Sequence, residues 1–156
     1  MPITITDIIS KIAHNKAALG IMLYGSASTY DISSFEREMG ITLPDDIKTF
    51  YNFCNGFESN EDLFRIIPLA EITEERNSNY LVRPGDFHIA EYMVYCDMWS
   101  ITIAANDPNK YSIYNKTDSV VTLTNSFSEF LDKFLAGGVY NGLYEWRAQI
   151  ENNAWL

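Results

Sequence analysis

The chain has 156 residues, of which 47% are hydrophobic, 14% aromatic and 21% charged. This profile excludes a disordered chain and predicts one packed domain over residues 1–156, able to bury roughly two thirds of its unfolded surface. Its 21 Asp and Glu against 11 Lys and Arg, a net charge of −10, disfavour direct nucleic-acid binding and favour either a basic protein partner or solubility alone.

The N-terminal residues predict a helix rather than a targeting segment. Isoleucines recur at helical spacing over residues 5–12, behind Thr4 and Thr6, either of which can cap the helix. The segment lacks a basic start followed by an apolar block, and no apolar run in the chain reaches about 18 residues. We therefore expect a cytoplasmic protein that does not enter the membrane.

A second helix is expected after an irregular stretch at residues 19–31. Ser33 and Glu36 stand at capping-box spacing, so this helix is predicted to start at Ser33. It should end at Gly40, because glycine accepts the left-handed backbone that closes a helix. The sequence here predicts a short helix followed by a hinge.

A third helix should begin at Pro44, since proline at the first helical position loses no hydrogen bond. Asp45 and Asp46 in its first turn favour the positive end of the helix dipole. Its apolar stripe and its closing pair follow at residues 47–54 and 55–56. Residues 35–56 are thus predicted to form a helix, a hinge and a helix.

From residue 63 the pattern changes to β-strands. Residues 63–69 predict a strand that leads into a helical turn over residues 70–76. Four further runs rich in β-branched and aromatic residues follow, separated by turn residues: 87–92, 99–106, 110–115 and 119–124. Because the connections are short, these strands are expected to be antiparallel neighbours.

The C-terminal part predicts helices again. Ser126 and Glu129 repeat the capping-box spacing, and an apolar face over residues 127–135 ends at a Gly-Gly pair. Apolar residues at helical spacing over residues 143–150 predict a final helix. Helices, then an antiparallel meander, then helices are the pattern of a single α+β domain, with the helix-hinge-helix pair packed on the sheet.

Residues able to carry chemistry are few. Cys54 and Cys96 lie among aromatics without metal-binding spacing, so both are predicted to be reduced and buried. His88 and Glu91 have opposite parity and would not share a face of a regular strand. Hydrolase, zinc-protease and nucleotide-binding motifs are absent, and we expect no catalytic residue, cofactor or metal.

Acidic residues concentrate in residues 58–75, where six stand against a single base, Arg65. A solvated surface explains such a cluster, and three of its members at helical spacing could also converge as a carboxylate site. We hypothesise instead a negative surface that docks a basic protein. The candidate partner-binding residues are Glu58, Glu61, Asp62, Glu71, Glu74 and Glu75. Among the aromatics, Tyr80 and Trp155 are expected to be least buried.

The run from Phe35 onward resembles the signature of the SUKH superfamily, the Smi/Knr-type domain. The matching pieces are Phe35-Glu36, Met39-Gly40, Leu43-Pro44, Ile47, Phe50, Tyr51 and Asn55-Gly56. Further matches follow in the expected order at Ile66 to Leu69, Trp99 to Ala104, Tyr111 to Tyr114, Ser126-Phe127 and Phe130-Leu131. The resemblance covers roughly residues 28 to 135.

This resemblance implies an α+β domain in which a helix pair packs on an antiparallel sheet. It implies a non-enzymatic immunity protein, since many bacterial members bind and block a cognate toxin, often a nuclease. A basic toxin domain is then the expected partner. Eukaryotic relatives are regulatory interaction proteins, so a cytoplasmic scaffold domain remains an alternative, as does an enzyme with an unrecognised carboxylate site. The resemblance carries over no catalytic residue, and the oligomeric state stays open.

Overall fold

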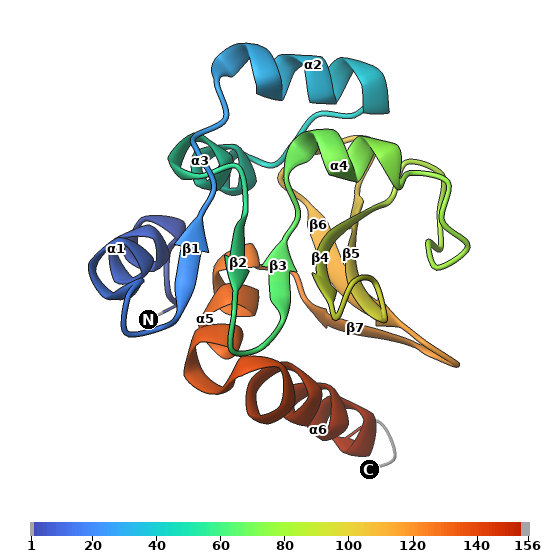
Figure 1. Ribbon diagram of the computed structural model, residues 1–156. Helices are drawn as coiled ribbons and strands as arrows, with labels where there is room; N and C mark the ends of the chain where they lie inside the picture. The colour runs from blue at the N-terminus through green and yellow to red at the C-terminus, as the bar shows by residue number, and fades with distance from the viewer. Residues whose placement is uncertain (1, 154–156) are drawn as a thin grey trace.

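The computed structural model describes residues 2–153 and contains a seven-stranded sheet (Figure 1), while Trp155 lies outside the described residues. Every strand is antiparallel to the next, and the strands lie side by side in sequence order. They are β1 (Ile21–Leu23), β2 (Phe57–Ser59), β3 (Phe64–Ile66), β4 (Phe87–Tyr92), β5 (Asp97–Ile103), β6 (Tyr111–Lys116) and β7 (Val120–Thr124). The predicted meander is confirmed, as is the single α+β domain.

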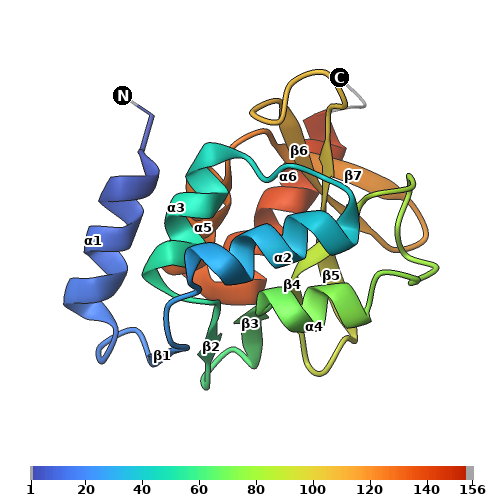
Figure 2. The same ribbon diagram turned by 90° about the horizontal axis from the view of Figure 1, so that it is seen from above.

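Helices interrupt this meander between β1 and β2 and between β3 and β4, and further helices precede β1 and follow β7. They are α1 (Ile5–Asn15), α2 (Thr29–Met39), α3 (Asp45–Phe53), α4 (Leu69–Glu74), α5 (Phe127–Gly137), the π-helical segment η1 (Gly138–Tyr144) and α6 (Glu145–Asn153). Helices α2 and α3 connect β1 to β2, and α4 connects β3 to β4. Seen from above in Figure 2, α2 and α4 lie side by side across one end of the sheet.

The inner face of the sheet packs on α3 and α5 through aromatic side chains. The ring of Phe64 on β3 stacks on Phe134 of α5, with 4.0 Å between centroids, and also contacts Trp99. Phe50 of α3 meets Phe127 edge-on at 5.1 Å. Burying aromatic side chains of this size supplies a large part of the folding free energy and holds sheet and helices in one fixed relation.

The predicted hinge is confirmed at Gly40, whose φ of 67° ends α2 in the left-handed region. The predicted start of α2 at Ser33 is wrong. Ser28 caps the helix instead and forms a reciprocal capping box with Asp31. The earlier start adds a turn of helical hydrogen bonds and buries Ile32, so it prevails over the later capping signal.

Two strands arise where the sequence predicts none. Strand β1 lies inside the stretch expected to be irregular, and β2 follows α3 directly. Each has three residues, too short to show an alternating pattern, and each forms through pairing with its neighbours. The Gly-Gly pair at residues 137–138 also leads into η1 rather than a loop, so α5, η1 and α6 are consecutive.

Candidate partner-binding surface

The outer face of the first four strands carries a row of polar and apolar side chains. Met22, Glu58, Arg65 and Glu91 are direct cross-strand neighbours on β1, β2, β3 and β4. Because side chains alternate along a strand, these residues point away from the aromatic core behind the sheet. Of the six predicted acids, Glu58 lies in this row, directly beside Arg65.

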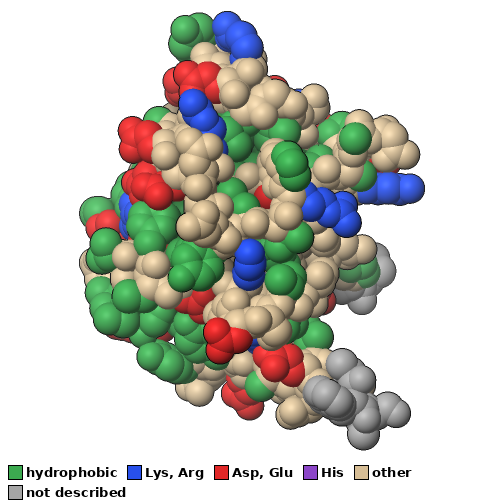
Figure 3. Space-filling view, turned by 90° about the vertical axis from the view of Figure 1, so that its right-hand side faces the viewer, with side chains coloured by type: hydrophobic (Ala, Val, Ile, Leu, Met, Phe, Trp, Pro, Cys, Tyr) green, Lys and Arg blue, Asp and Glu red, His purple; other side chains and the backbone are tan. Residues whose placement is uncertain are grey.

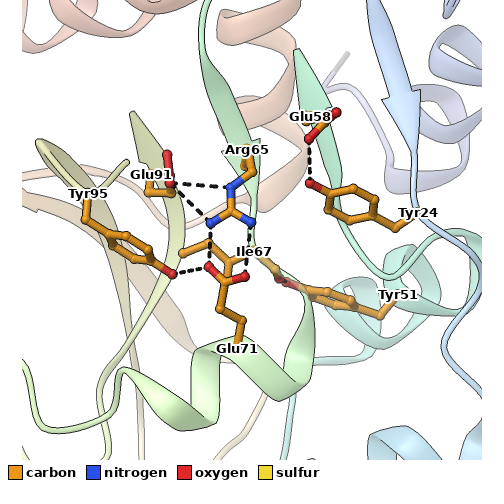
Figure 4. Close-up of polar contacts among 8 residues, drawn as sticks. All are labelled: Tyr24, Tyr51, Glu58, Arg65, Ile67, Glu71, Glu91 and Tyr95. Atoms are coloured by element: carbon orange, nitrogen blue, oxygen red, sulfur yellow. Dashed lines mark hydrogen bonds and ion pairs between the residues drawn. The ribbon is translucent and has the colours of Figure 1, made fainter. Parts of the chain in front are cut away.

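Arg65 joins the sheet to helix α4. Its guanidinium donates two hydrogen bonds to the carboxylate of Glu71, and one of its nitrogens lies 3.2 Å from Glu91 Oε2. Figure 4 shows the guanidinium between the two carboxylates, with the hydroxyl of Tyr95 directed at Glu71. The planar fork of arginine suits this bidentate pairing, so the four side chains form one network.

The charges in this network perturb one another. The hydrogen bonds that Arg65 donates to Glu71 lower the pKa of the Glu71 carboxyl and raise the pKa of Arg65. Burial raises the pKa of Glu91, whose side chain is only 3% exposed, and burial also raises the pKa of Tyr95. The network thus joins α4 and the turn after β4 to β3 through ion pairs and hydrogen bonds. Both of its carboxylates are bound to Arg65.

Two tyrosines fasten the neighbouring backbone to the same sheet. Tyr24 donates a 3.0 Å hydrogen bond to Glu58, and the buried Tyr51 donates one of 2.7 Å to the carbonyl of Ile67. Burial raises the pKa of both phenols. These bonds hold the segment before α2 and the segment before α4 in place on either side of Arg65.

A pocket of about 260 Å³ opens beside the network. Its walls come from the β2–β3 turn and the β4–β5 turn, and its lining includes Leu63, Met93 and Val94 together with the carboxylate-bearing strands. All three of these residues are exposed apolar side chains with positive φ angles. An apolar pocket next to charged groups has the composition of a recognition site.

The six predicted acids fall in three places. Glu58 lines the pocket, whereas Glu71 lies outside the lining and is hydrogen-bonded to the lining residue Arg65. Glu61 and Asp62 lie in the β2–β3 turn, where Asp62 accepts a 3.4 Å hydrogen bond from Val139 N–H. Glu74 and Glu75 lie at the end of α4, away from that turn. Of the six acids, the structure therefore places only Glu58 in the lining of the pocket, and the other five lie outside it.

Glu74 lines a second hollow, a groove of about 590 Å³ between α2 and α4. Phe35 and Leu69 contribute apolar surface, and an ion pair of 3.7 Å joins Glu38 of α2 to Arg76, just after the end of α4. The lining combines charged, polar and apolar side chains. This groove is a separate surface from the pocket beside Arg65.

Sequence reasoning missed the residues that organise the surface. It counted Arg65 only as a lone base among acids, and it did not find Glu91, Tyr95 or the apolar turn residues. A usable signal was present: Arg65 alternates with the core residues Phe64 and Ile66, which places it on the opposite face.

The expectations about histidine and cysteine need correction. A bulge between His88 and Ala90 shifts the register, so His88 and Glu91 fall on the same face of β4. His88 is buried, which lowers its pKa to about 4, and its Nδ1 lies 2.6 Å from Ser100 Oγ. Both cysteines are free as predicted, but Cys96 is exposed in the β4–β5 turn, and only Cys54 is buried.

Comparison with known proteins agrees with this architecture, an α+β domain of the Smi/Knr type. Residues 26–133 match the model of the SMI1 / KNR4 family (SUKH-1), and the chain belongs to this family. The match runs from the residues before α2 into α5 and leaves out α1, β1, η1 and α6. No curated protein matches the chain.

Two kinds of feature are absent from the part of the chain that the structure describes. Within residues 2–153, no helix combines the length and the apolar character that a membrane crossing needs. In the same part of the chain, no three His, Cys, Asp or Glu side chains come together in a way that could hold a metal ion.

Proposed function

We propose that this chain is a cytoplasmic, non-enzymatic immunity protein that binds a cognate toxin and blocks it. Members of the SUKH family are generally non-enzymatic immunity or regulatory proteins, and they commonly bind protein partners. A net charge of −10 favours a basic partner, for which a nuclease toxin is the natural example. The toxin would be neutralised when its nucleic-acid surface is covered.

The observation that carries this proposal is the combination of acids and exposed apolar side chains on the outer sheet face. Figure 3, which views the molecule from the right-hand side of Figure 1, shows acidic and hydrophobic side chains with some Lys and Arg among them along its left-hand edge, which is the front of Figure 1. Exposed apolar groups supply affinity at an interface, and surrounding acids speed the encounter with a basic protein. An inhibitor that competes with nucleic acid needs both high affinity and fast association with the toxin.

A regulatory domain that binds another cytoplasmic protein is a second candidate. The groove between α2 and α4 favours it, because a hollow between two helices suits a peptide segment of a partner. An enzyme built on converging acids is less well supported, since Glu71 and Glu91 are both bound to Arg65.

Co-expression with the toxin encoded by the neighbouring gene of the native host tests the immunity role. We expect the chain to restore growth and to co-purify with the toxin domain. Failure to restore growth, with the chain expressed and folded, would rule out immunity to that toxin. Capture by this chain of a non-toxic host protein instead, identified by mass spectrometry and confirmed by direct titration, would favour the regulatory alternative.

A further inference from the structure

The β4–β5 turn holds three consecutive residues in a disfavoured backbone conformation. Met93, Val94 and Tyr95 have φ angles of 50°, 52° and 64°. A β-branched side chain such as that of valine is rarely found in this left-handed region, because its branched Cβ crowds the backbone. Val94 is nonetheless 88% exposed, so burial of its side chain does not compensate for this conformation.

Neighbouring contacts maintain the turn in this form. Met93 N–H donates a 3.0 Å hydrogen bond to the carbonyl of Leu63, itself a positive-φ residue in the β2–β3 turn. Tyr95 is bound through its hydroxyl to Glu71. The two turns are therefore held together, while the side chains of Leu63 and Val94 that line the pocket between them stay largely exposed. Strained backbone that persists under such constraints is concentrated at functional sites.

The pocket of about 260 Å³ lies between these turns and has room for a large apolar side chain. The charged residues in its lining differ in whether they form ion pairs. Arg65 is engaged by Glu71 and Glu91, whereas Glu58 accepts a hydrogen bond from Tyr24 but forms no ion pair with any residue of the described chain. The pocket thus offers an apolar hollow with a carboxylate at its rim that has no cationic partner within residues 2–153.

We propose that this pocket, formed by Leu63, Met93 and Val94 with Glu58 at its rim, is the primary docking site for the protein partner. Its occupant is an apolar side chain flanked by Lys or Arg, with the apolar group between the turns and a cation facing Glu58. The inference rests on the proposed function and specifies where and how the basic toxin is held. A second copy of this chain is a poorer occupant, because two chains of net charge −10 repel each other.

A peptide titration tests the chemistry of the pocket directly. The ¹⁵N-labelled full chain is titrated with an acetylated, amidated peptide Gly-Lys-Leu-Lys-Gly, followed by amide chemical shifts. We expect shifts confined to residues 58–65 and 91–96, and none with Gly-Lys-Ser-Lys-Gly or Gly-Glu-Leu-Glu-Gly. Shifts that are absent, spread elsewhere, or equal for the serine peptide would overturn the proposal. So would concentration-dependent self-association that broadens the same amides.

The substitution Val94→Asn separates recognition from folding. Asparagine tolerates a positive φ, so the variant should melt at a higher temperature than the unmodified chain. It should nonetheless bind the toxin domain from the co-expression assay at least about tenfold more weakly. Val82→Asn, the same change in another exposed loop, is the matched control and should keep full affinity.

The result distinguishes this inference from the proposed function. If the unmodified chain does not bind the toxin, the immunity role fails, and the peptide titration still decides the pocket chemistry. If the unmodified chain and Val94→Asn bind the toxin equally, the docking site is wrong while immunity stands.

Discussion

The guanidinium of Arg65 donates two hydrogen bonds to the carboxylate of Glu71 and thereby joins strand β3 to helix α4. Beside this pair lies Glu91, whose carboxylate is almost fully buried and which has Arg65 as its cationic partner. Breaking a buried pair by removing one partner is costly because an uncompensated charge remains. The stability of this part of the sheet should therefore depend strongly on Arg65.

Replacing Arg65 with methionine should lower the free energy of unfolding by about 3 kcal/mol, because Glu91 would remain buried without its partner. Urea denaturation followed by circular dichroism measures the change. As a matched control, Lys11→Met removes an exposed ion pair with Asp132 and should cost less than about 1 kcal/mol. Equal losses for both variants would show that the Arg65 network is no stronger than a surface pair.

Two glycines with positive φ should differ sharply in their tolerance of a side chain. A Cβ at Gly56, where φ is 92°, would lie 2.2 Å from the carbonyl oxygen of Ile66, whereas a Cβ at Gly40 meets nothing within 4 Å. Gly40→Ala should cost about 1 kcal/mol of backbone strain. Gly56→Ala should cost more than about 3 kcal/mol, since the sheet backbone must move.

Denaturant titrations of the two alanine variants check this ranking. Gly40→Asn provides a control, since asparagine accepts the left-handed conformation and should recover part of the loss. Similar stabilities for Gly40→Ala and Gly56→Ala would contradict the close approach of Gly56 to β3.

His88 should make stability depend on pH. Its pKa is about 4 in the folded state, against an ordinary value of 6.5, because burial disfavours the charged imidazole. The unfolded chain therefore binds the proton more readily between these values. The contribution of neutral His88 to the free energy of unfolding is fully present above pH 6.5. It is lost as pH falls toward 4, by about 3 kcal/mol in total.

The measurement is the difference in unfolding free energy between the unmodified chain and His88→Asn across pH 4 to 7. This difference removes contributions common to both proteins, including those of Glu91 and Glu71, whose pKa values shift in opposite directions. We expect the difference to change steadily below pH 6.5. A difference that is independent of pH would show that the folded protein accommodates a charged His88.

The long elements could be predicted because their patterns are local. The isoleucine stripe of α1, the Gly40 hinge and the aromatic face of α5 all follow from neighbours three or four residues apart. Strands β1 and β2 could not be predicted, since their structure depends on pairing between residues far apart in the chain.

The candidate surface was only partly accessible to sequence reasoning for the same reason. Composition located the acids, but it could not show that Glu71 is paired with Arg65 or that Glu74 lies in a separate groove. Nor could it show that Leu63 and Val94 meet at one pocket, because a hydrogen bond between two turns brings them there. Contacts across 26 residues, such as Arg65 to Glu91, require the fold itself.

The acidic surface should control how fast a basic toxin associates. The double variant Glu58→Lys with Glu61→Lys should lower the association rate constant by about tenfold and weaken its dependence on salt, because steering acts before contact. Asp118→Lys with Glu145→Lys changes the net charge equally at other exposed positions and is the matched control. Stopped-flow binding to the toxin domain at several ionic strengths measures both rates. If the two double variants slow association equally, the effect comes from net charge alone, and the acids of residues 58–62 do not form the docking surface.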